Sequence, residues 1–141
     1  MNLNKKPELV CKENGKIFRL YTEGITFSKI NLDNGQDNKC KKCDYLIIKE
    51  TQDIQIFIEL KGKDIKKAYE QILASYDNKE SIKNSQVKYY AAIVSQRIPQ
   101  QDTAIQNLHK KAKKIFVKIF IKNKEIQTQY NLHDNSIEKI N

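Results

Sequence analysis

The chain has 141 residues and three cysteines, which suits one domain with its own core and argues against a secreted disulfide framework. No apolar stretch reaches the roughly 20 residues of a membrane span, and the first ten residues lack a signal-peptide core, so we expect a cytoplasmic, single-domain protein over residues 1–141 with no membrane partner. Lys and Arg number 26 against 17 Asp and Glu, a formal net charge of +9 that favours a nucleic-acid partner over an anionic membrane surface, with a codon bias toward Lys as the alternative source.

Alternating apolar and polar residues in the first half predict four strands, over residues 16–22, 25–32, 44–50 and 53–61. Glu23 and Gly24 have the composition of a tight turn between the first two strands, and residues 33–42 that of a loop. The polar residues 51–53 predict a hairpin between the last two. We expect these four strands to follow one another as a meander.

From residue 64 onward the apolar residues recur at helical spacing, with Asp64 as the N-cap of the helix. Residues 87–95 are apolar on both faces, which is typical of a central strand. The remaining segments are expected to form a second helix over 102–114, a buried strand over 115–121, an edge strand over 125–132 and a frayed tail over 133–141.

This order of elements predicts the fold class. A run of strands followed by alternating helices and strands favours an α/β or α+β fold, in which helices pack on a mixed β-sheet. No linker rich in proline or glycine and no internal repeat marks a second domain. We therefore expect one mixed sheet flanked by helices.

The stretch "IFIELKGKD" carries two charges in a strand that is otherwise apolar. Because side chains alternate along a strand, Glu59 and Lys61 point to the same face, about 7 Å apart at roughly 3.3 Å per residue. A hairpin turn at residues 51–53 pairs position 44 near position 60, which brings Asp44 beside Glu59. Two carboxylates and a lysine at one end of a sheet suit Mg²⁺ and the hydrolysis of phosphodiester bonds.

These residues resemble the PD-(D/E)XK nuclease superfamily, which includes many restriction endonucleases and Holliday-junction resolvases. The resemblance lies in Asp44, in Glu59-Leu60-Lys61 at the end of the next strand, and in the helix that follows. It covers about residues 40–122 and implies a restriction-endonuclease-like mixed sheet. It also implies an Mg²⁺-dependent nuclease acting on DNA rather than RNA, as a homodimer if both strands are cut.

The resemblance implies roles for individual residues. Asp44 and Glu59 would be metal ligands, with the backbone carbonyl of Leu60 as a third and Mn²⁺ as a substitute for Mg²⁺. Lys61 would be the catalytic lysine, and Gln71 on the following helix would assist near the metal or phosphate.

The sequence departs from the superfamily pattern at two places. Cys43 stands where the motif has proline, and this is tolerated because the carboxylate is the working group. Many members also carry an acidic residue on an N-terminal helix, which this sequence does not predict. Glu8, Glu13 and Glu23 are candidates, and the pattern places none of them.

Lysines near the motif and on the second predicted helix favour contacts with a phosphate backbone. A solvated helix face is the alternative interpretation of the second group. The candidate nucleic-acid-binding residues are Lys41, Lys42, Lys63, Lys66, Lys67, Lys110, Lys111, Lys113 and Lys114.

Other readings compete with a nuclease. Cys40 and Cys43 have the spacing of a zinc knuckle, but only Cys11 and a distant His109 or His133 offer further ligands, so we do not expect zinc. Glu59 and Lys61 alternatively form an ordinary ion pair at a solvated strand end. The chain is then either a catalytically degenerate nuclease-fold module that binds nucleic acid or a protein partner, or an interaction protein of unrelated fold.

Overall fold

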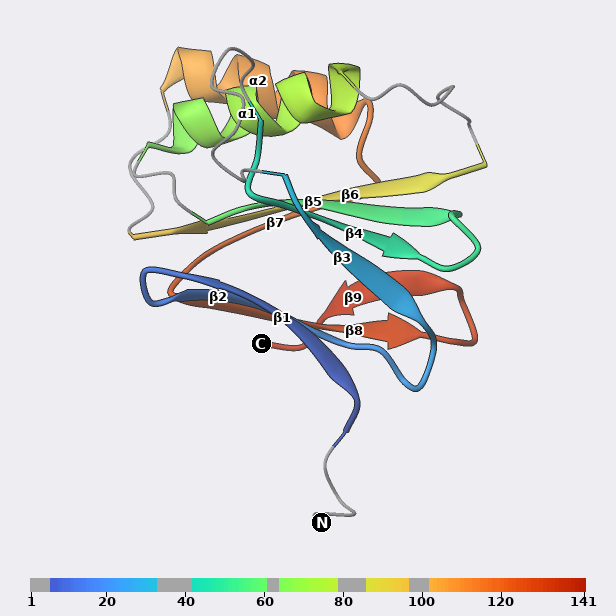
Figure 1. The fold of residues 1–141 in the computed structure, drawn as a ribbon. Helices are drawn as coiled ribbons and strands as arrows, with labels where there is room; N and C mark the ends of the chain where they lie inside the picture. The colour runs from blue at the N-terminus through green and yellow to red at the C-terminus, as the bar shows by residue number, and fades with distance from the viewer. Residues whose placement is uncertain (1–5, 33–41, 61–63, 79–85, 97–101) are drawn as a thin grey trace.

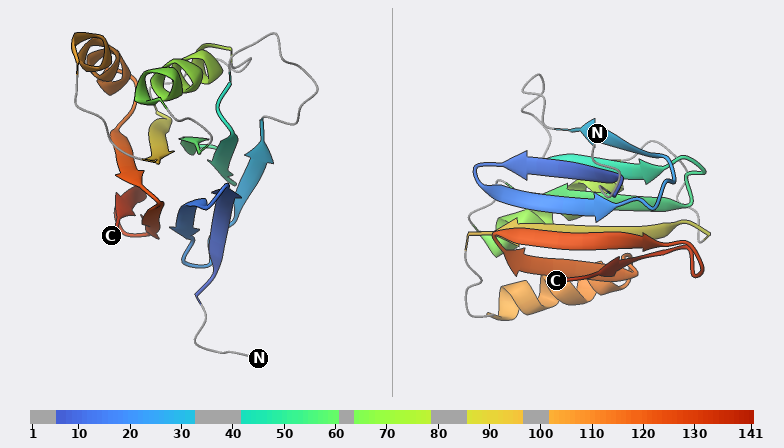
Figure 2. Two further views of the ribbon diagram at one scale, coloured as in Figure 1. Left: turned by 90° about the vertical axis from the view of Figure 1, so that its left-hand side faces the viewer. Right: turned by 90° about the horizontal axis from the view of Figure 1, so that it is seen from below.

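The computed structural model describes residues 6–32, 42–60, 64–78, 86–96 and 102–141. Within these ranges, two mixed sheets and two helices form three layers (Figure 1). The helices cover one face of a five-stranded sheet, and a four-stranded sheet packs against the other face (Figure 2). The fold is therefore mixed α+β, as the sequence predicted, but helices lie on only one face of the central sheet.

The five-stranded sheet has the strand order β3-β4-β5-β6-β7. Its antiparallel part, β3-β4-β5, confirms the predicted hairpin, and β5, β6 and β7 run parallel to one another. The strands are β3 (Phe27–Asn31), β4 (Tyr45–Lys49), β5 (Ile54–Glu59), β6 (Lys88–Ser95) and β7 (Lys118–Asn123).

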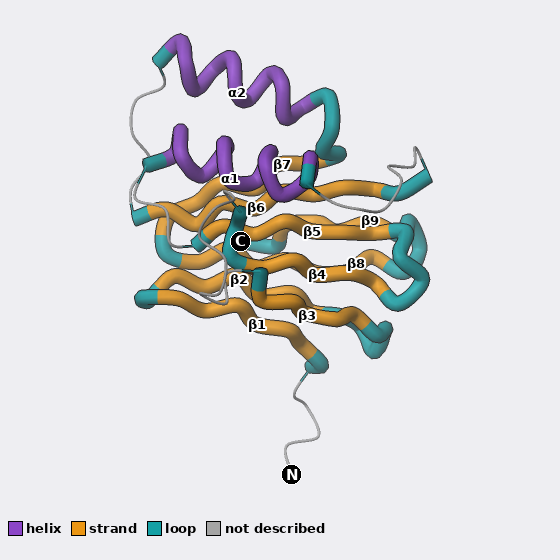
Figure 3. Tube along the Cα trace, turned by 45° about the horizontal axis from the view of Figure 1, so that its top comes forward, coloured by secondary structure: helices purple, strands orange, loops and turns teal. Residues whose placement is uncertain are grey.

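The two helices, α1 (Ile65–Asp77) and α2 (Thr103–Lys113), connect the parallel strands. The side chain of Asp64 caps α1 by accepting from the N–H of Lys66, as predicted, and Asp102 caps α2 in the same way. Crossovers between parallel strands are almost always right-handed, so two crossovers made in the same direction along the sheet place both helices on one face. They lie side by side there (Figure 3), joined by a hydrogen bond of 2.7 Å between the Tyr69 hydroxyl and Nδ1 of His109.

The four-stranded sheet has the order β1-β2-β8-β9 and corrects the predicted meander. Its strands are β1 (Glu8–Glu13), β2 (Lys16–Tyr21), β8 (Glu125–Asn131) and β9 (Ser136–Lys139). The turn at Glu23 and Gly24 exists, with positive φ at both residues, but it carries the chain from one sheet to the other. A turn signal shows where a strand ends and does not show which sheet the next strand joins.

The structure differs from the predicted strands at four further places. β1 was not predicted, and β8 is an internal strand between β2 and β9 instead of an edge strand. The tail does not fray, because β9 pairs with β8 and buries Ile137 completely. β7 begins at Lys118, later than predicted, because the N–H groups of Ile115 and Phe116 still bond to the carbonyl of Ala112 at the end of α2.

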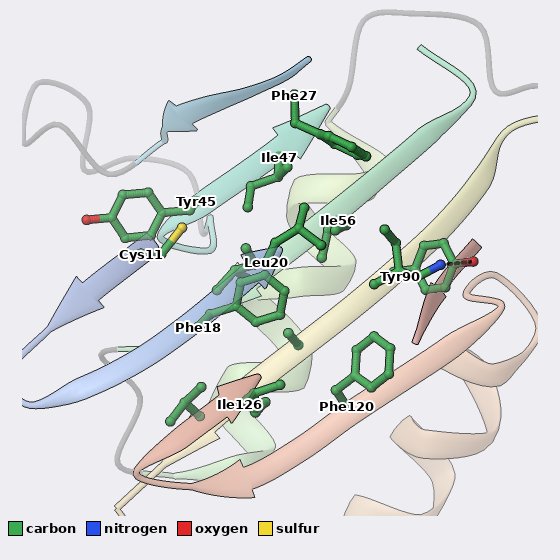
Figure 4. Close-up of a cluster of buried hydrophobic side chains, with 14 of the residues drawn as sticks. Cys11, Phe18, Leu20, Phe27, Tyr45, Ile47, Ile56, Tyr90, Phe120 and Ile126 are labelled. Carbon is green, nitrogen blue, oxygen red and sulfur yellow. Dashed lines mark hydrogen bonds between the residues drawn. The ribbon is translucent and has the colours of Figure 1, made fainter. Parts of the chain in front are cut away.

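Two hydrophobic clusters lie on the two faces of the five-stranded sheet. Between the sheets, Phe18 and Leu20 of β2 pack with Ile56 and Tyr90 (Figure 4). Under the helices, Phe57 packs with residues of α1 and α2. Because β5 faces both clusters, all of its residues are buried. In the part of the chain that the structure describes, no helix is long and apolar enough to cross a membrane.

Candidate active site

Asp44 and Glu59 lie side by side where β4 begins and β5 ends. The pairing of the two strands runs outward to Tyr45 opposite Ile58. One residue farther out, the N–H of Asp44 donates to the carbonyl of Ile58 at 3.0 Å. The Oδ2 atom of Asp44 accepts a hydrogen bond from the N–H of Leu60 at 2.7 Å. Asp44 is thus bonded to both neighbours of Glu59, as expected from the predicted hairpin.

Both carboxylates of this pair are buried. Asp44 is 3% exposed and Glu59 is 2% exposed. Removing a carboxylate from water is costly unless hydrogen bonds or a cation compensate, and two of them in one place add mutual repulsion. Such an arrangement is typical of a site that binds a cation.

Both carboxylates act electrostatically on the thiol of Cys43 and raise its pKa. The pKa of Cys43 is raised to about 12. Burial is the largest cause, and the negative charges of Glu59 and Asp44 act in the same direction, against hydrogen bonds from Ser75 and the backbone that lower the pKa. The thiol is therefore neutral at physiological pH and is a poor nucleophile. It also donates a weak hydrogen bond to the carbonyl of Tyr45 at 3.5 Å.

Leu60 and Lys61 follow Glu59 directly in the sequence. The side chain of Leu60 is fully buried in the cluster between the sheets, and its N–H is bonded to Asp44. This fixes the backbone at the proposed third ligand. The predicted catalytic lysine, Lys61, lies outside the described residues, as do Lys41 and Lys63.

Gln71 lies on the flank of α1 that turns toward the start of β4. Ser75 follows Gln71 by one helical turn, and residues four apart on a helix share a flank. The Oγ atom of Ser75 accepts a hydrogen bond of 2.7 Å from the N–H of Cys43, the residue before Asp44. Gln71 is half-buried. Gln71 therefore shares a flank of α1 with Ser75, and its role near a metal or phosphate stays a prediction.

The candidate N-terminal carboxylates lie in or next to the four-stranded sheet. Glu8 forms an ion pair with Arg19 at 2.8 Å, and Glu13 accepts a hydrogen bond of 3.0 Å from the hydroxyl of Tyr45. Tyr45 follows Asp44 in sequence, but its side chain belongs to the cluster between the sheets. Glu23 is exposed in the turn between β2 and β3.

The predicted DNA-binding lysines fall into two groups. Lys66 and Lys67 are exposed on the first turn of α1, which begins five residues after Leu60, and Lys42 is half-buried two residues before Asp44. The exposed lysines near the end of α2 lie at the opposite end of the sheet from the carboxylate pair. The reason is that α2 begins after the end of β6 and ends near the start of β6, where the N–H of Val117 bonds to the carbonyl of Tyr89. These lysines are Lys110, Lys111, Lys113 and Lys114.

Sequence reasoning missed two lysines at the carboxylate end. Lys122 lies next to last in β7, and Lys124 is exposed in the turn into β8. Ile121 of β7 pairs with Ile93, which itself pairs with Glu59, so these lysines lie just beyond the level of Glu59. Neighbouring strands are about 4.8 Å apart, and β6 lies between β5 and β7, so the lysines of β7 lie roughly 10 Å to the side of the carboxylate. The sequence feature that could have found them is Lys122, which directly follows the buried strand predicted over residues 115–121.

The residues considered for zinc are dispersed among the described parts of the chain. Cys11 is buried between the sheets, and burial raises its pKa to about 12. Cys43 lies in the cluster under the helices, and His109 bonds to Tyr69. His133 is exposed between β8 and β9, and Cys40 falls outside the described residues.

The candidate site consists of two carboxylates, those of Asp44 and Glu59. Among the described residues, no group of three or more His, Cys, Asp or Glu side chains is arranged to hold a metal ion. A pair of carboxylates matches Mg²⁺, which keeps several waters and takes other ligands from substrate phosphates. Comparison of the chain with protein-family models, with curated proteins and with solved structures found no match.

Proposed function

We propose that this protein is an Mg²⁺-dependent nuclease that hydrolyses phosphodiester bonds of DNA. The observation that carries the proposal is the buried pair of Asp44 and Glu59 at adjoining strand ends. The order of β4, β5, α1 and β6 agrees with the topology that the PD-(D/E)XK resemblance implies. Assignment to the restriction-endonuclease-like fold is part of this proposal.

The donor atoms at the site fit a hard divalent cation. The two carboxylates and the carbonyl of Leu60 offer oxygen alone, which Mg²⁺ and Mn²⁺ prefer. Cys43 offers a protonated thiol, which is a weak ligand, because its pKa is raised to about 12. Mg²⁺ bound there would supply positive charge to the pentavalent transition state and would activate water.

Individual residues would bind the cation, orient the attacking water and contact the phosphates. Asp44, held by the N–H of Leu60, and Glu59 would fix the cation against the end of β5. Lys61 would orient the attacking water and offset charge that develops on the phosphate. Gln71 would donate to a phosphate oxygen from the flank of α1. Lys66 and Lys67 would contact neighbouring phosphates along the strand being cut.

Cleavage of supercoiled plasmid and of branched DNA in Mg²⁺ or Mn²⁺ tests this proposal. We expect Glu59→Ala and Lys61→Ala to lower the cleavage rate on the order of 100-fold, the scale for removing one group that stabilises a transition state. Glu50→Ala is the matched control, since Glu50 is exposed after β4 at the other end of the sheet. If the wild-type protein cleaves no faster than Glu59→Ala, the nuclease proposal fails.

A catalytically degenerate module that binds nucleic acid is the second candidate. The engagement of Glu8 with Arg19 and of Glu13 with Tyr45 favours it, because superfamily members often use an N-terminal carboxylate at the metal. A module of this kind would bind duplex DNA with a steep dependence on salt, and it would not cleave in either metal. Measuring binding and cleavage on the same duplex separates the two functions.

A further inference from the structure

Ser75 of α1 is bonded to the backbone of the strand that carries Asp44. Its Oγ atom accepts a hydrogen bond of 2.7 Å from the N–H of Cys43, which lies 32 residues earlier in the sequence. Ser75 is 9% exposed and Cys43 is 0% exposed, so water does not compete for this bond. The Ser75 side chain also lowers the pKa of the Cys43 thiol, against the larger effect of burial, which raises it.

This hydrogen bond lies where the regular pairing of β4 ends. Cys43 precedes the first residue of β4 by two positions, so no strand partner is fixed for its N–H by the β4–β5 ladder. Asp44 itself is held by its N–H to Ile58, by its carbonyl to the N–H of Leu32 and by its carboxylate to Leu60. Ser75 supplies a further hydrogen bond to this short segment, one residue before Asp44, and this bond comes from the helix layer.

Building on the proposed function, we propose that Ser75 is a positioning residue for the metal-binding carboxylates. Its hydroxyl fixes Cys43, and through the adjoining peptide it fixes Asp44 beside Glu59. The same bond aligns the flank of α1 that carries Gln71 with the start of β4. Without the hydroxyl, a buried N–H loses its partner and the segment before β4 is free to shift.

The experiment compares Ser75→Ala and Ser75→Thr with Thr128→Val in the full chain. Thr128 is the matched control, because its fully buried hydroxyl donates at 2.8 Å to a backbone carbonyl of Arg19 in the four-stranded sheet. Ser75→Thr keeps the hydroxyl. The readouts are the affinity for Mn²⁺ alone, measured by calorimetry, and the exchange rate of the Cys43 amide hydrogen, measured by NMR.

Ser75→Ala is expected to speed exchange of the Cys43 amide and to weaken Mn²⁺ binding roughly tenfold, the lower range for loss of a group that orients a metal ligand. Ser75→Thr is expected to retain both properties, and Thr128→Val to lose stability with unchanged Mn²⁺ affinity. Unchanged Mn²⁺ affinity in Ser75→Ala overturns the role of Ser75 and leaves the nuclease proposal standing. A wild-type protein that binds no Mn²⁺ overturns both.

Discussion

The carboxylate of Asp44 accepts a hydrogen bond from the backbone N–H of Leu60 at 2.7 Å, which ties the residue before β4 to the residue after β5. A hydrogen bond to the charged form of a carboxylate helps to keep that charge in a buried place. The bond also closes the open end of the hairpin. Glu59, held between Ile58 and Leu60, is thereby fixed beside Asp44.

The carboxylate pair predicts that divalent metal stabilises the protein. At about 100 times the dissociation constant, a ligand that binds only the folded state adds about 2.7 kcal/mol, which corresponds to a rise of roughly 5–10 °C in the melting temperature of a chain this size. We expect Mn²⁺ to produce this rise in the wild-type protein and to produce none in Glu59→Gln. Thermal scans with and without Mn²⁺ measure it, and an equal rise in both proteins would place the metal elsewhere.

The lysines at the two ends of the helix layer predict separate effects on DNA binding and on catalysis. Alanine at Lys110, Lys111 and Lys113 is expected to reduce the slope of log affinity against log salt by up to about 2.7, at roughly 0.9 per phosphate contact. Cleavage at saturating DNA should stay unchanged, because this end of α2 lies opposite the carboxylates.

Lys66→Ala with Lys67→Ala provides the comparison, since both residues begin α1 on the carboxylate side. That double variant is expected to slow cleavage even at saturating DNA. Fluorescence anisotropy on one duplex over a range of salt gives the slopes. A slope that is unchanged in the α2 variant would mean that its lysines only face solvent.

Asn135 is predicted to be a main stabilising residue of the described structure. Its side chain accepts from Lys49 at 2.8 Å and from the Tyr130 hydroxyl at 2.7 Å, and it donates to Asp53 at 2.8 Å. Its φ of 50° lies in the left-handed region, which Asn tolerates better than Ala. With about 1 kcal/mol for each hydrogen bond and about 1 kcal/mol for the backbone, Asn135→Ala should lower the free energy of unfolding by roughly 3–4 kcal/mol.

Asn135→Gly separates the two contributions, because glycine accepts the positive φ and cannot make the side-chain bonds. We expect it to lose about 1 kcal/mol less than the alanine variant. Urea unfolding followed by circular dichroism gives both values. Equal losses in the two variants would mean that the backbone conformation carries no cost at this turn.

The lowered pKa of Asp53 predicts how the stability of the protein depends on pH in the acid range. Its hydrogen bond from the Thr51 hydroxyl is the largest cause that lowers its pKa, followed by the bond from Asn135, and the charge of Lys49 adds to them. A lowered pKa in the folded state gives stability that is present above the ordinary pKa, near 4, and is lost as pH falls through the folded value. The free energy of unfolding should therefore decrease as the pH drops below about 4, and it should decrease less steeply in Asp53→Asn. An identical slope in the two proteins would exclude this contribution from Asp53.

The hairpin and the site on it could be predicted because their signals are local. Polar residues at 51–53 set the turn, and the alternation on each side sets which residues meet. Asp44 and Glu59 are therefore brought together by a register that a short stretch of sequence determines. The cap at Asp64 likewise marks where α1 begins. The helix carries Ser75, which bonds to the N–H of Cys43 just before β4.

The second sheet could not be predicted, because nothing local distinguishes a strand of one layer from a strand of the next. β2 and β3 are separated by a short turn, yet they join different sheets. β8 was predicted as an edge strand, because the alternation of its side chains is the same whether the strand pairs with one neighbouring strand or with two. The sequence did not place the α2 lysines relative to the carboxylates for a related reason, because sequence distance from Glu59 does not show at which end of the sheet a helix ends.

The parallel pairing of β2 with β8 has a consequence for the order in which the protein folds during synthesis. The Thr128 hydroxyl bonds to the carbonyl of Arg19 across 109 residues, so this contact forms only after residues 19–128 have left the ribosome. Until then the β1–β2 hairpin has Phe18 and Leu20 without their final cover, and an isolated hairpin is at best marginally stable. The nascent chain therefore exposes these apolar side chains until residue 128 has been made, so early capture by chaperones and slow final pairing of the two strands are the expected course of its folding.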